Sequence, residues 1–587
     1  MTTEKLILSI PDFAILAITL LISASIGIYF RFSGNKQKTN EEYLLAGKDM
    51  SILPVAVSLM ATYFSAITLM GMPAEIYLYG TNMTFLNIGF FLGPAIAAYL
   101  FIPIYFRAGI STAYEYLEKR FGRSTRTLLS SLYVIQNIMY TAVALYAPAL
   151  ALNAVTSISL EISIVSIGFV CTFYSAMGGM KAVLWTDVFQ TILMYVCLLT
   201  IVIKGCLDLG GITQVFRIAH DGGRLVVPKF SFNLESHYTM ISVVAVALIR
   251  TTGAYAVNQE QVQRIMTLRN SKRATIAILL SVPIFVTFNL LCCLCGLIFY
   301  AYFRTCDPLT SPDKPIQAAD QIIPFYIATA LNAYPGLPGL CIAGIFSASL
   351  SSISSQLNAF AAVMTVNFIK PVWPNLSKSV LLTKTLCILD GILCITLSFF
   401  INSIGNLIKT TIIVVGTIVG PNLAVFLLGC LTTTANEEGV ILGVVAGLAV
   451  SSYLNFGPAL STYPRLPFSN ECHYQNFTSN VTNTPYITPP PTIDPLNTHD
   501  PSHEDSFRLS YLWIIPFATV TCLIISYISS FIVRCFRDKP DVPTKYMTPI
   551  RCCFSEHVSQ KKISKKFTPL LNEEINFQML ETATITS

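Results

Sequence analysis

The sequence predicts an all-α polytopic membrane protein, and its composition and hydropathy pattern both support this fold class. Of the 587 residues, 53% are hydrophobic and only 12% are charged, and the mean hydropathy is +0.62. Such values lie outside the range of soluble globular chains. The apolar residues gather into runs of about 20, the length of helix that crosses about 30 Å of hydrocarbon. We therefore expect the lipid bilayer to be the solvent of this chain.

A scan for runs of this length predicts about thirteen transmembrane helices. An odd number of spans places the two termini on opposite sides of the membrane. The first run is long enough to span, so we expect a retained helix rather than a cleaved signal peptide. The runs cover residues 8–30, 51–79, 84–106, 127–154, 159–177, 183–204, 239–260, 273–303, 336–366, 378–402, 406–430, 438–456 and 510–534.

Positive charge indicates the orientation, because cytoplasmic loops are enriched in Lys and Arg. The cations form short clusters between apolar runs, so the net charge of +6 does not indicate nucleic-acid binding. We expect a multi-pass plasma-membrane protein with residues 1–7 outside the cell and residues 535–587 as a flexible cytosolic tail. The cations that predict cytoplasmic loops are Arg31, Lys36, Lys38, Lys48, Arg107, Lys119, Arg120, Arg123, Arg264, Arg269, Lys272 and Arg273.

The Ser-, Thr- and Pro-rich stretch 457–509 is predicted to be an extracellular loop. Asn476 and Asn480 lie in Asn-X-Thr acceptor sequences, so we expect both to be glycosylated. Most of the 16 cysteines lie inside apolar runs and act there as small hydrophobic residues. Cys306 and Cys472 are the clearest thiol pair on the oxidising side, and we predict a disulfide between them.

Two predicted spans contain residues that can interrupt a helix. The second span contains Gly71-Met72-Pro73, and the seventh contains the segment from Arg250 to Gly253. These breaks begin two five-helix sets, residues 51–204 and 239–430. A broken helix exposes backbone carbonyls, which membrane proteins tolerate only beside a cavity, so a matched pair favours a transporter. The alternative is that Gly and Pro are simply common in transmembrane helices.

The ninth span is rich in hydroxyl and amide groups from Phe346 to Asn358. Neighbouring hydroxyls and a backbone carbonyl can together bind a small hard cation such as sodium. The alternative is helix packing, with each hydroxyl bonded to its own backbone. Asp187, in the sixth span, is an ionisable group within an apolar run and therefore a site candidate. It lies near the cytoplasmic end of that span, so a solvated interfacial carboxylate is the alternative.

Several stretches together resemble the sodium/solute symporter family, and within it the anion branch of sodium-coupled monocarboxylate, iodide and multivitamin transporters. They are GGMKAVLWTDVFQ at 178–190, VNQEQVQR at 257–264 and TAYEYLEKRF at 112–121. The resemblance runs from about residue 10 to residue 535 and implies a five-plus-five inverted-repeat core with a discontinuous first core helix. Span 8–30 and spans 438–456 and 510–534 would be flanking helices.

The resemblance also implies sodium as the coupling ion, with no other cofactor or metal. The principal sodium site of the family would use backbone oxygens and two hydroxyls here, from Ala61, Phe64, Ala348, Ser351 and Ser352. A second family site would map to Asp187, Ser354, Ser355, Thr62, Ser65 and Gln190. With both sites, two sodium ions would move in each cycle.

The central substrate pocket of the family would map to Thr68, Tyr140, Arg250, Thr251, Asn258 and Gln261. The chain departs from the branch at Arg250-Thr251, where its members usually have Thr-Trp. This change removes an aromatic ring and adds a fixed cation. Arg250 would hold a substrate carboxylate if it faces the cavity. Otherwise it would pair with Asp390 or another buried carboxylate, or extend to the membrane interface.

From these residues we expect sodium-coupled secondary active symport of a small organic anion by alternating access. Short monocarboxylates are the first expectation, and biotin, pantothenate or iodide are alternatives. A second class is a solute sensor that keeps the fold without transporting. A membrane-embedded enzyme is disfavoured, because no His or Cys cluster lies beside a carboxylate within the spans.

Overall fold

Helices account for the regular structure of the chain. The computed structural model describes residues 8–32, 39–156, 158–311, 314–401, 407–456, 463–468, 509–537 and 542–548. Within these ranges the elements are helices only. Nine are long and apolar enough to span a membrane, or up to eleven if two bent pairs each count as one span. The all-α polytopic prediction is confirmed, and the count of about thirteen stays a prediction.

The long helices follow the predicted apolar runs. They are α1 (Ile10–Phe32), α5 (Leu86–Leu100), α8 (Arg123–Val155), α9 (Leu160–Asp208), α13 (Ser271–Phe303), α15 (Leu337–Val363), α17 (Val380–Ile401), α18 (Leu407–Leu431), α19 (Glu437–Phe456) and α20 (Ile514–Phe536). Shorter helices break or connect them: α2 (Asn40–Leu45), α3 (Ile52–Tyr63), α4 (Ala66–Tyr79), α6 (Ile102–Ala108), α7 (Ala113–Arg120), α10 (Ile212–Asp221), α11 (Met240–Ala256), α12 (Gln259–Ile265), α14 (Ile322–Ala330) and α16 (Lys370–Val372).

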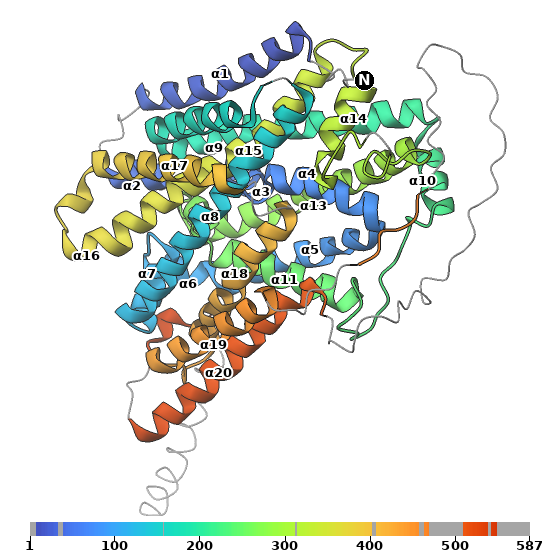
Figure 1. Ribbon diagram of the computed structural model, residues 1–587. Coiled ribbons are helices and arrows are strands. Elements are labelled where there is room, and N and C mark those ends of the chain that lie inside the picture. Colours follow the sequence, from blue (N-terminus) through green and yellow to red (C-terminus); the bar gives the residue numbers. More distant parts are fainter. Residues whose placement is uncertain are drawn as a thin grey trace, which may run out of the picture.

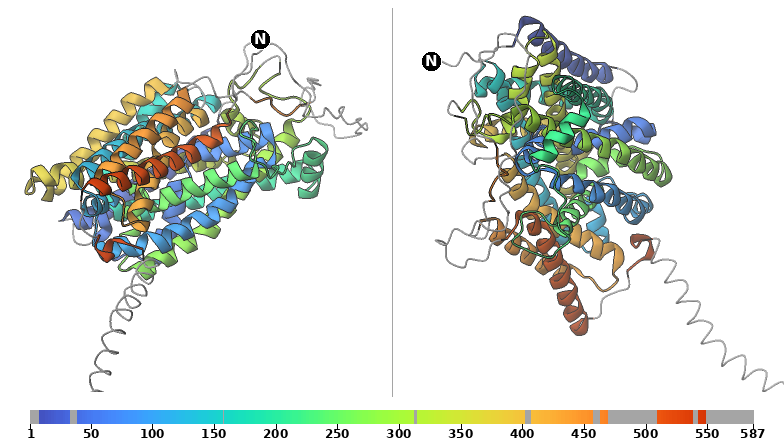
Figure 2. Two further views of the ribbon diagram at one scale, coloured as in Figure 1. Left: turned by 90° about the horizontal axis from the view of Figure 1, so that it is seen from below. Right: turned by 90° about the vertical axis from the view of Figure 1, so that its right-hand side faces the viewer.

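The serine-rich helix α15 lies in the core of the bundle. The protein buries 89% of the residues in its most apolar stretch but only 17% of those in the corresponding stretch of α1, so α1 lies at the surface of the bundle. α15 packs against α8, α9 and α17, while α1 covers α9 at one edge and α19 and α20 lie together at the other (Figure 1). The long helices run side by side in one bundle (Figure 2).

A glycine kink joins the fifth and sixth predicted spans within α9. Gly179 has φ +62°, which is unfavourable for residues with a Cβ. A Cβ at Gly179 would also lie 2.8 Å from the backbone oxygen of Tyr43. The Gly178-Gly179 pair therefore redirects the chain between residues 159–177 and 183–204 and brings α2 against the kink.

The first helix break lies before the predicted position. α3 ends at Tyr63 and α4 begins at Ala66, whereas Gly71-Met72-Pro73 lies inside α4. Sequence offers no Gly or Pro at the true break. Its cause is tertiary, because the Phe64 ring packs 4.5 Å from that of Phe285 and 4.6 Å from that of Phe288 on α13. The prediction at residues 71–73 was therefore wrong by about two helical turns.

The second break also differs from its prediction. α11 is continuous through Arg250 and Gly253 and ends at Ala256, and α12 then leaves at an angle of 55°. The carbonyl of Gly253 accepts hydrogen bonds from the N–H groups of both Val257 and Asn258. This shared acceptor closes α11, so the break lies at 257–258 and not at 250–253.

Candidate functional site

The predicted principal sodium residues come from α3, the break after it and α15, which pack together. Ala61, Phe64, Ala348, Ser351 and Ser352 are all fully buried. Because the chain turns away at Phe64, the carbonyls of Ala61 and Phe64 receive no backbone N–H from any described residue. Buried carbonyls normally have a donor, so these two are available to a cation.

The two serines of this site have different partners. Ser352 Oγ donates to the carbonyl oxygen of Ala348 at 3.2 Å, the bond to its own helix that simple packing also predicts. Ser351 Oγ instead donates to Asp187 Oδ1 at 2.6 Å, across to α9. Ser351 therefore connects the principal site to the carboxylate of the second one.

Asp187 is fully buried and forms an ion pair with Arg264, so it is not a solvated interfacial carboxylate. Arg264 Nη2 lies 2.9 Å from Asp187 Oδ2. Ser58 Oγ donates to the same oxygen at 2.5 Å and accepts from Arg264 Nε at 2.7 Å. The guanidinium therefore lies in the region where the second sodium ion was predicted.

The other predicted residues of the second site surround this ion pair only in part. Ser355 Oγ accepts a short hydrogen bond from Arg264 Nη2 and lies 3.2 Å from Thr62 Oγ1. Ser354 Oγ donates to the carbonyl of Ser351 at 3.1 Å. Gln190 is buried, and its amide finds no hydrogen-bond partner in the described part of the chain. Ser65 lies apart, in the wall of a cavity.

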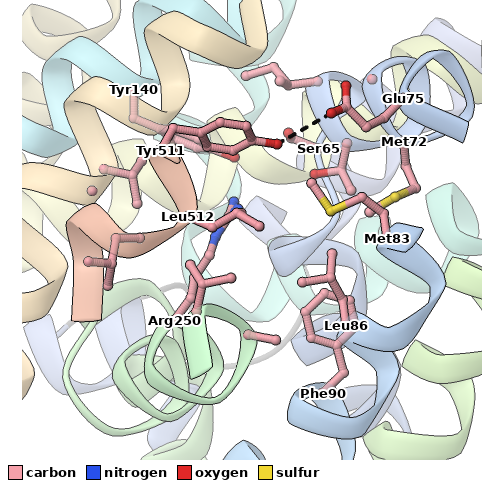
Figure 3. A pocket seen from close by; sticks show the side chains of 18 residues that line it. Ser65, Met72, Glu75, Met83, Leu86, Phe90, Tyr140, Arg250, Tyr511 and Leu512 are labelled. Carbon is pink, nitrogen blue, oxygen red and sulfur yellow. Dashed lines mark hydrogen bonds between the residues drawn. The ribbon is translucent and has the colours of Figure 1, made fainter. Parts of the chain in front are cut away.

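A cavity of about 120 Å³, here called the outer cavity, lies between α4, α5, α8, α11, α18 and α20. Ser65, Thr68, Tyr140 and Arg250 belong to its wall. Figure 3 shows the Arg250 guanidinium extending from α11 into this space. Most of the remaining lining is apolar and includes Met72, Met83, Leu86, Phe90 and Leu512.

Glu75 lies on the opposite side of the outer cavity from Arg250 (Figure 3). Its carboxylate accepts a hydrogen bond from Tyr511 at 3.3 Å and a short one from Tyr238. Tyr238 in turn stacks on His237, and His237 stacks on Tyr463 at 4.0 Å. These contacts connect the cavity wall to segment 463–468.

A second cavity of about 50 Å³, here called the inner cavity, lies at the α11–α12 break. Arg250 and Tyr140 line both cavities, so they form the partition between them. Asn258, Gln261 and Thr62 also line the inner cavity. The structure thus brings five of the six predicted substrate residues to two neighbouring cavities.

Thr251 is the predicted substrate residue that the structure does not bring to either cavity. Its hydroxyl donates to the carbonyls of Ala247 at 2.7 Å and Gly89 at 3.1 Å. A Cβ on Gly93 would lie 2.0 Å from this hydroxyl. Thr251 therefore belongs to the close packing of α11 on α5.

Arg250 has no ion pair or hydrogen bond with another described residue, and its guanidinium carbon lies 5.9 Å from the centre of the Tyr63 ring. Asp390, the partner considered from sequence, lies buried on α17 and accepts from Cys394 Sγ at 3.6 Å. The pair with Asp390 is not formed. The alternative with Arg250 facing a cavity matches the geometry.

Sequence reasoning missed three charged residues of the site. Arg264 was assigned to a cytoplasmic loop, yet it is fully buried. Glu75 and Glu260 line the outer and inner cavities. The signal that could have found both carboxylates is the one that found Asp187, an ionisable residue inside a predicted span.

On the side of segment 463–468, Cys306 is disulfide-bonded. Cys472, Asn476 and Asn480 lie outside the described residues. Twelve other cysteines in the described part of the chain are free, and the Cys306–Cys472 pairing stays a prediction.

Comparison with known proteins agrees with the geometry. The sequence profile of the sodium:solute symporter family matches residues 43–447. A putative sodium-dependent multivitamin transporter of Drosophila melanogaster is 40% identical over 453 residues, covering 76% of this chain and 75% of the relative. Sodium-coupled monocarboxylate transporter 1 of Mus musculus is 37% identical over 534 residues, covering 88% and 86%.

A solved structure supports the fold. The substrate-bound outward-open state of a Na+-coupled sialic acid symporter superimposes with a TM-score of 0.74 at 21% identity, covering 91% of this chain and 99% of that one. The profile match alone spans more than half of the sequence. The broken α3–α4 helix, the serine face of α15 and these similarities lead to one conclusion: the chain belongs to the sodium:solute symporter family.

Proposed function

We propose that the chain is a sodium-coupled symporter of a small organic anion, with short monocarboxylates as the first choice. The observation that carries this proposal is Arg250, which lies at the partition between two cavities and forms no ion pair with any described residue. Arg250 is half-buried within an apolar helix, where a cation without a counter-ion is energetically costly. An anionic solute in either cavity would supply the missing partner.

The shape of the guanidinium favours a carboxylate. Its planar fork can donate two parallel hydrogen bonds to the two oxygens of a carboxylate, a match that a spherical halide cannot make. The apolar lining around Met83, Leu86 and Phe90 would hold an alkyl group. An organic carboxylate therefore fits the outer cavity better than iodide does.

The volume of the outer cavity distinguishes between small and large carboxylate substrates. Drug-sized ligands occupy pockets of about 300–1,000 Å³, and the outer cavity holds about 120 Å³. This favours short monocarboxylates over biotin or pantothenate in this conformation. The vitamin alternative keeps its place because a relative at 40% identity is described as a multivitamin transporter.

Sodium would couple to the solute through the α3–α4 break. An ion held by the carbonyls of Ala61, Phe64 and Ala348 and the hydroxyls of Ser351 and Ser352 would bind α3 to α15. Tyr140 and Arg250, on α8 and α11, separate the cavities above and below this junction. Sodium binding would thereby favour one of two states that open the partition to opposite sides.

A second sodium ion at Asp187 would compete with Arg264. The Asp187 carboxylate already accepts from Arg264, Ser58 and Ser351. A sodium ion bound by Asp187, Ser354, Ser355 and Thr62 requires the guanidinium to move away. We therefore propose two sodium ions per cycle only for a state in which the Asp187–Arg264 pair is open.

The proposed location is the plasma membrane, with the N-terminus and the loop 457–509 outside and the tail 535–587 inside. Two observations support this orientation. Cys306, on the predicted outer side, is oxidised. Segment 463–468 packs over the predicted outer end of α4, where Leu466 N donates to the carbonyl of Leu78 at 3.1 Å.

Sodium-dependent currents in injected oocytes test the function. We expect currents with lactate, butyrate or nicotinate that disappear when choline replaces sodium, and none with glucose. Larger currents with biotin or iodide would move the substrate to an alternative class. Surface expression without current or uptake for every solute would favour the sensor and contradict the transport proposal.

A further inference from the structure

The inner cavity contains a set of oxygen acceptors, of which only Gln261 was predicted to contact the substrate. Glu260, Gln136, Asn137 and Gln261 line it together. Each of these side chains is more than nine-tenths buried. Since the solute is proposed to be an anion, a wall of oxygen acceptors is not what its carboxylate needs.

Three side-chain carbonyl oxygens of this set lack a donor among the described residues: Gln136 Oε1, Asn137 Oδ1 and Gln261 Oε1. The orientation of two amides follows from their nitrogen contacts. Asn137 Nδ2 donates to Gln356 Oε1 at 2.5 Å, and Gln261 Nε2 donates to the carbonyl of Leu59 at 3.1 Å. Their oxygens are therefore the atoms left without a partner.

Glu260 adds the negative charge of the set. One carboxylate oxygen accepts from Tyr133 at 2.9 Å, and no cation lies within 4.0 Å of the carboxylate among the described ion pairs. Arg264 donates to the backbone oxygen of Glu260, while its own ion pair is with Asp187. Arg250 lines the same cavity from the partition.

A buried carboxylate beside neutral oxygens that lack donors is a poor arrangement unless a positive group joins it. Small hard cations and ammonium groups both take such oxygens as ligands. The cavity of about 50 Å³ exceeds the roughly 10–15 Å³ that one water-sized occupant needs. It therefore has room for such a group.

We propose that the inner cavity is a binding site for a small cationic group, with Glu260 supplying the charge and Gln136, Asn137 and Gln261 supplying neutral oxygens. The group is either an alkali-metal ion or the ammonium end of a zwitterionic solute whose carboxylate binds Arg250. Thr62, assigned above to the second sodium site, also lines this cavity, but Glu260, Gln136, Asn137 and Gln261 belong to neither of the sodium sites proposed above. The alkali-ion form of the proposal is independent of the proposed function, whereas the ammonium form rests on the proposed binding of a carboxylate at Arg250.

The test compares wild type, Glu260→Gln and the matched control Glu161→Gln, which removes an exposed carboxylate at the start of α9. One arm counts radioactive sodium ions bound per purified full-length chain at saturation. The other measures binding of propionate and of β-alanine, which differ by an ammonium group. Both arms measure binding and need no transport, so they can succeed or fail independently of the proposed function.

If the group is an alkali ion, Glu260→Gln binds one sodium ion fewer per chain than wild type and Glu161→Gln. If it is an ammonium group, wild type prefers β-alanine over propionate and Glu260→Gln loses at least about fivefold of that preference. The proposal is overturned if Glu260→Gln binds sodium and both solutes as wild type does. A Glu260 that merely carries a proton would give this result.

A second variant covers failure of Glu260→Gln to fold. Gln136→Leu keeps the net charge of the site but removes the amide group and with it one neutral oxygen. We expect it to weaken binding of the same cationic group by about threefold or more. Unchanged affinity in Gln136→Leu would overturn the proposed ligand set.

Discussion

The outer and inner cavities share Arg250 and Tyr140 but have opposite linings. The outer cavity is walled mainly by apolar residues, whereas amide side chains and Glu260 form much of the wall of the inner one. An apolar wall beside a guanidinium suits the alkyl group and carboxylate of one small acid. The acceptor-rich wall suits a positive group instead. This difference indicates that one arginine can line two cavities that favour chemically different groups.

The largest expected effect is at the shared partition. Arg250→Gln should raise the half-saturating carboxylate concentration by roughly ten- to a hundredfold, because charge-assisted hydrogen bonds contribute about 1.5–3 kcal/mol. The half-saturating sodium concentration should change little. Oocyte currents measure both values, and Arg269→Gln, at an exposed cation, is the control. Equal losses for every solute and for sodium would assign Arg250 to the scaffold.

The next effect concerns the sodium ion that we propose to lie between α3 and α15. Replacing Ser351 and Ser352 together by Ala removes two hydroxyl ligands, and the apparent sodium affinity should fall about tenfold or more. Surface biotinylation shows whether the variant reaches the membrane. Ser529→Ala removes a hydroxyl bonded to its own helix on α20 and should behave as wild type. Unchanged sodium dependence in the double variant would mean that the serines serve helix packing.

A smaller effect on chain-length preference should show whether the alkyl group of the solute lies in the apolar outer cavity or in the polar inner one. Leu512→Ala enlarges the outer cavity, and longer carboxylates should gain up to about fourfold over acetate, since one buried methylene contributes about 0.8 kcal/mol. Uptake of acetate, butyrate and hexanoate gives the ratio. The same chain-length preference in wild type and Leu512→Ala would show that the alkyl group does not lie in this cavity.

The smallest expected effect is a pH dependence of the packing around His237, which lies outside the membrane-spanning segments. Burial lowers the pKa of His237 from 6.5 to about 3, where it is surrounded by Tyr79, Tyr238, Tyr463 and Tyr511. When segment 463–468 is not packed against His237, the imidazole takes up a proton below pH 6.5, whereas in the packed state it stays neutral. The contribution of His237 to the stability of this packing is therefore complete above pH 6.5 and is lost as the pH falls towards 3.

Hydrogen exchange of residues 463–468 checks this pH dependence. Protection in wild type relative to His237→Phe should decrease between pH 7.5 and pH 5.5, because Phe keeps the stacking and cannot be protonated. A constant difference between the two proteins over this range would contradict docking through a neutral His237.

Much of the site chemistry was readable without coordinates. Asp187, Ser351 and Ser355 were identified because polar groups in a lipid-facing sequence require a reason, and the structure brings all three into one hydrogen-bond network. Arg250 was singled out for the same reason. Glu75 and Glu260 obey the same rule and could have been found, whereas the burial of Arg264 could not, because a basic residue near a span end normally indicates a cytoplasmic loop.

The sequence by itself determined the all-α membrane fold, the family and the polar face of α15, because hydropathy over about 20 residues and long motifs are properties of the chain alone. Tertiary structure decided where the helices break and which charges meet. Phe64 leaves the helix because aromatic rings of α13 pack against it. Arg264 reaches Asp187, and Arg250 does not reach Asp390, because contacts between residues far apart in sequence depend on how the helices pack.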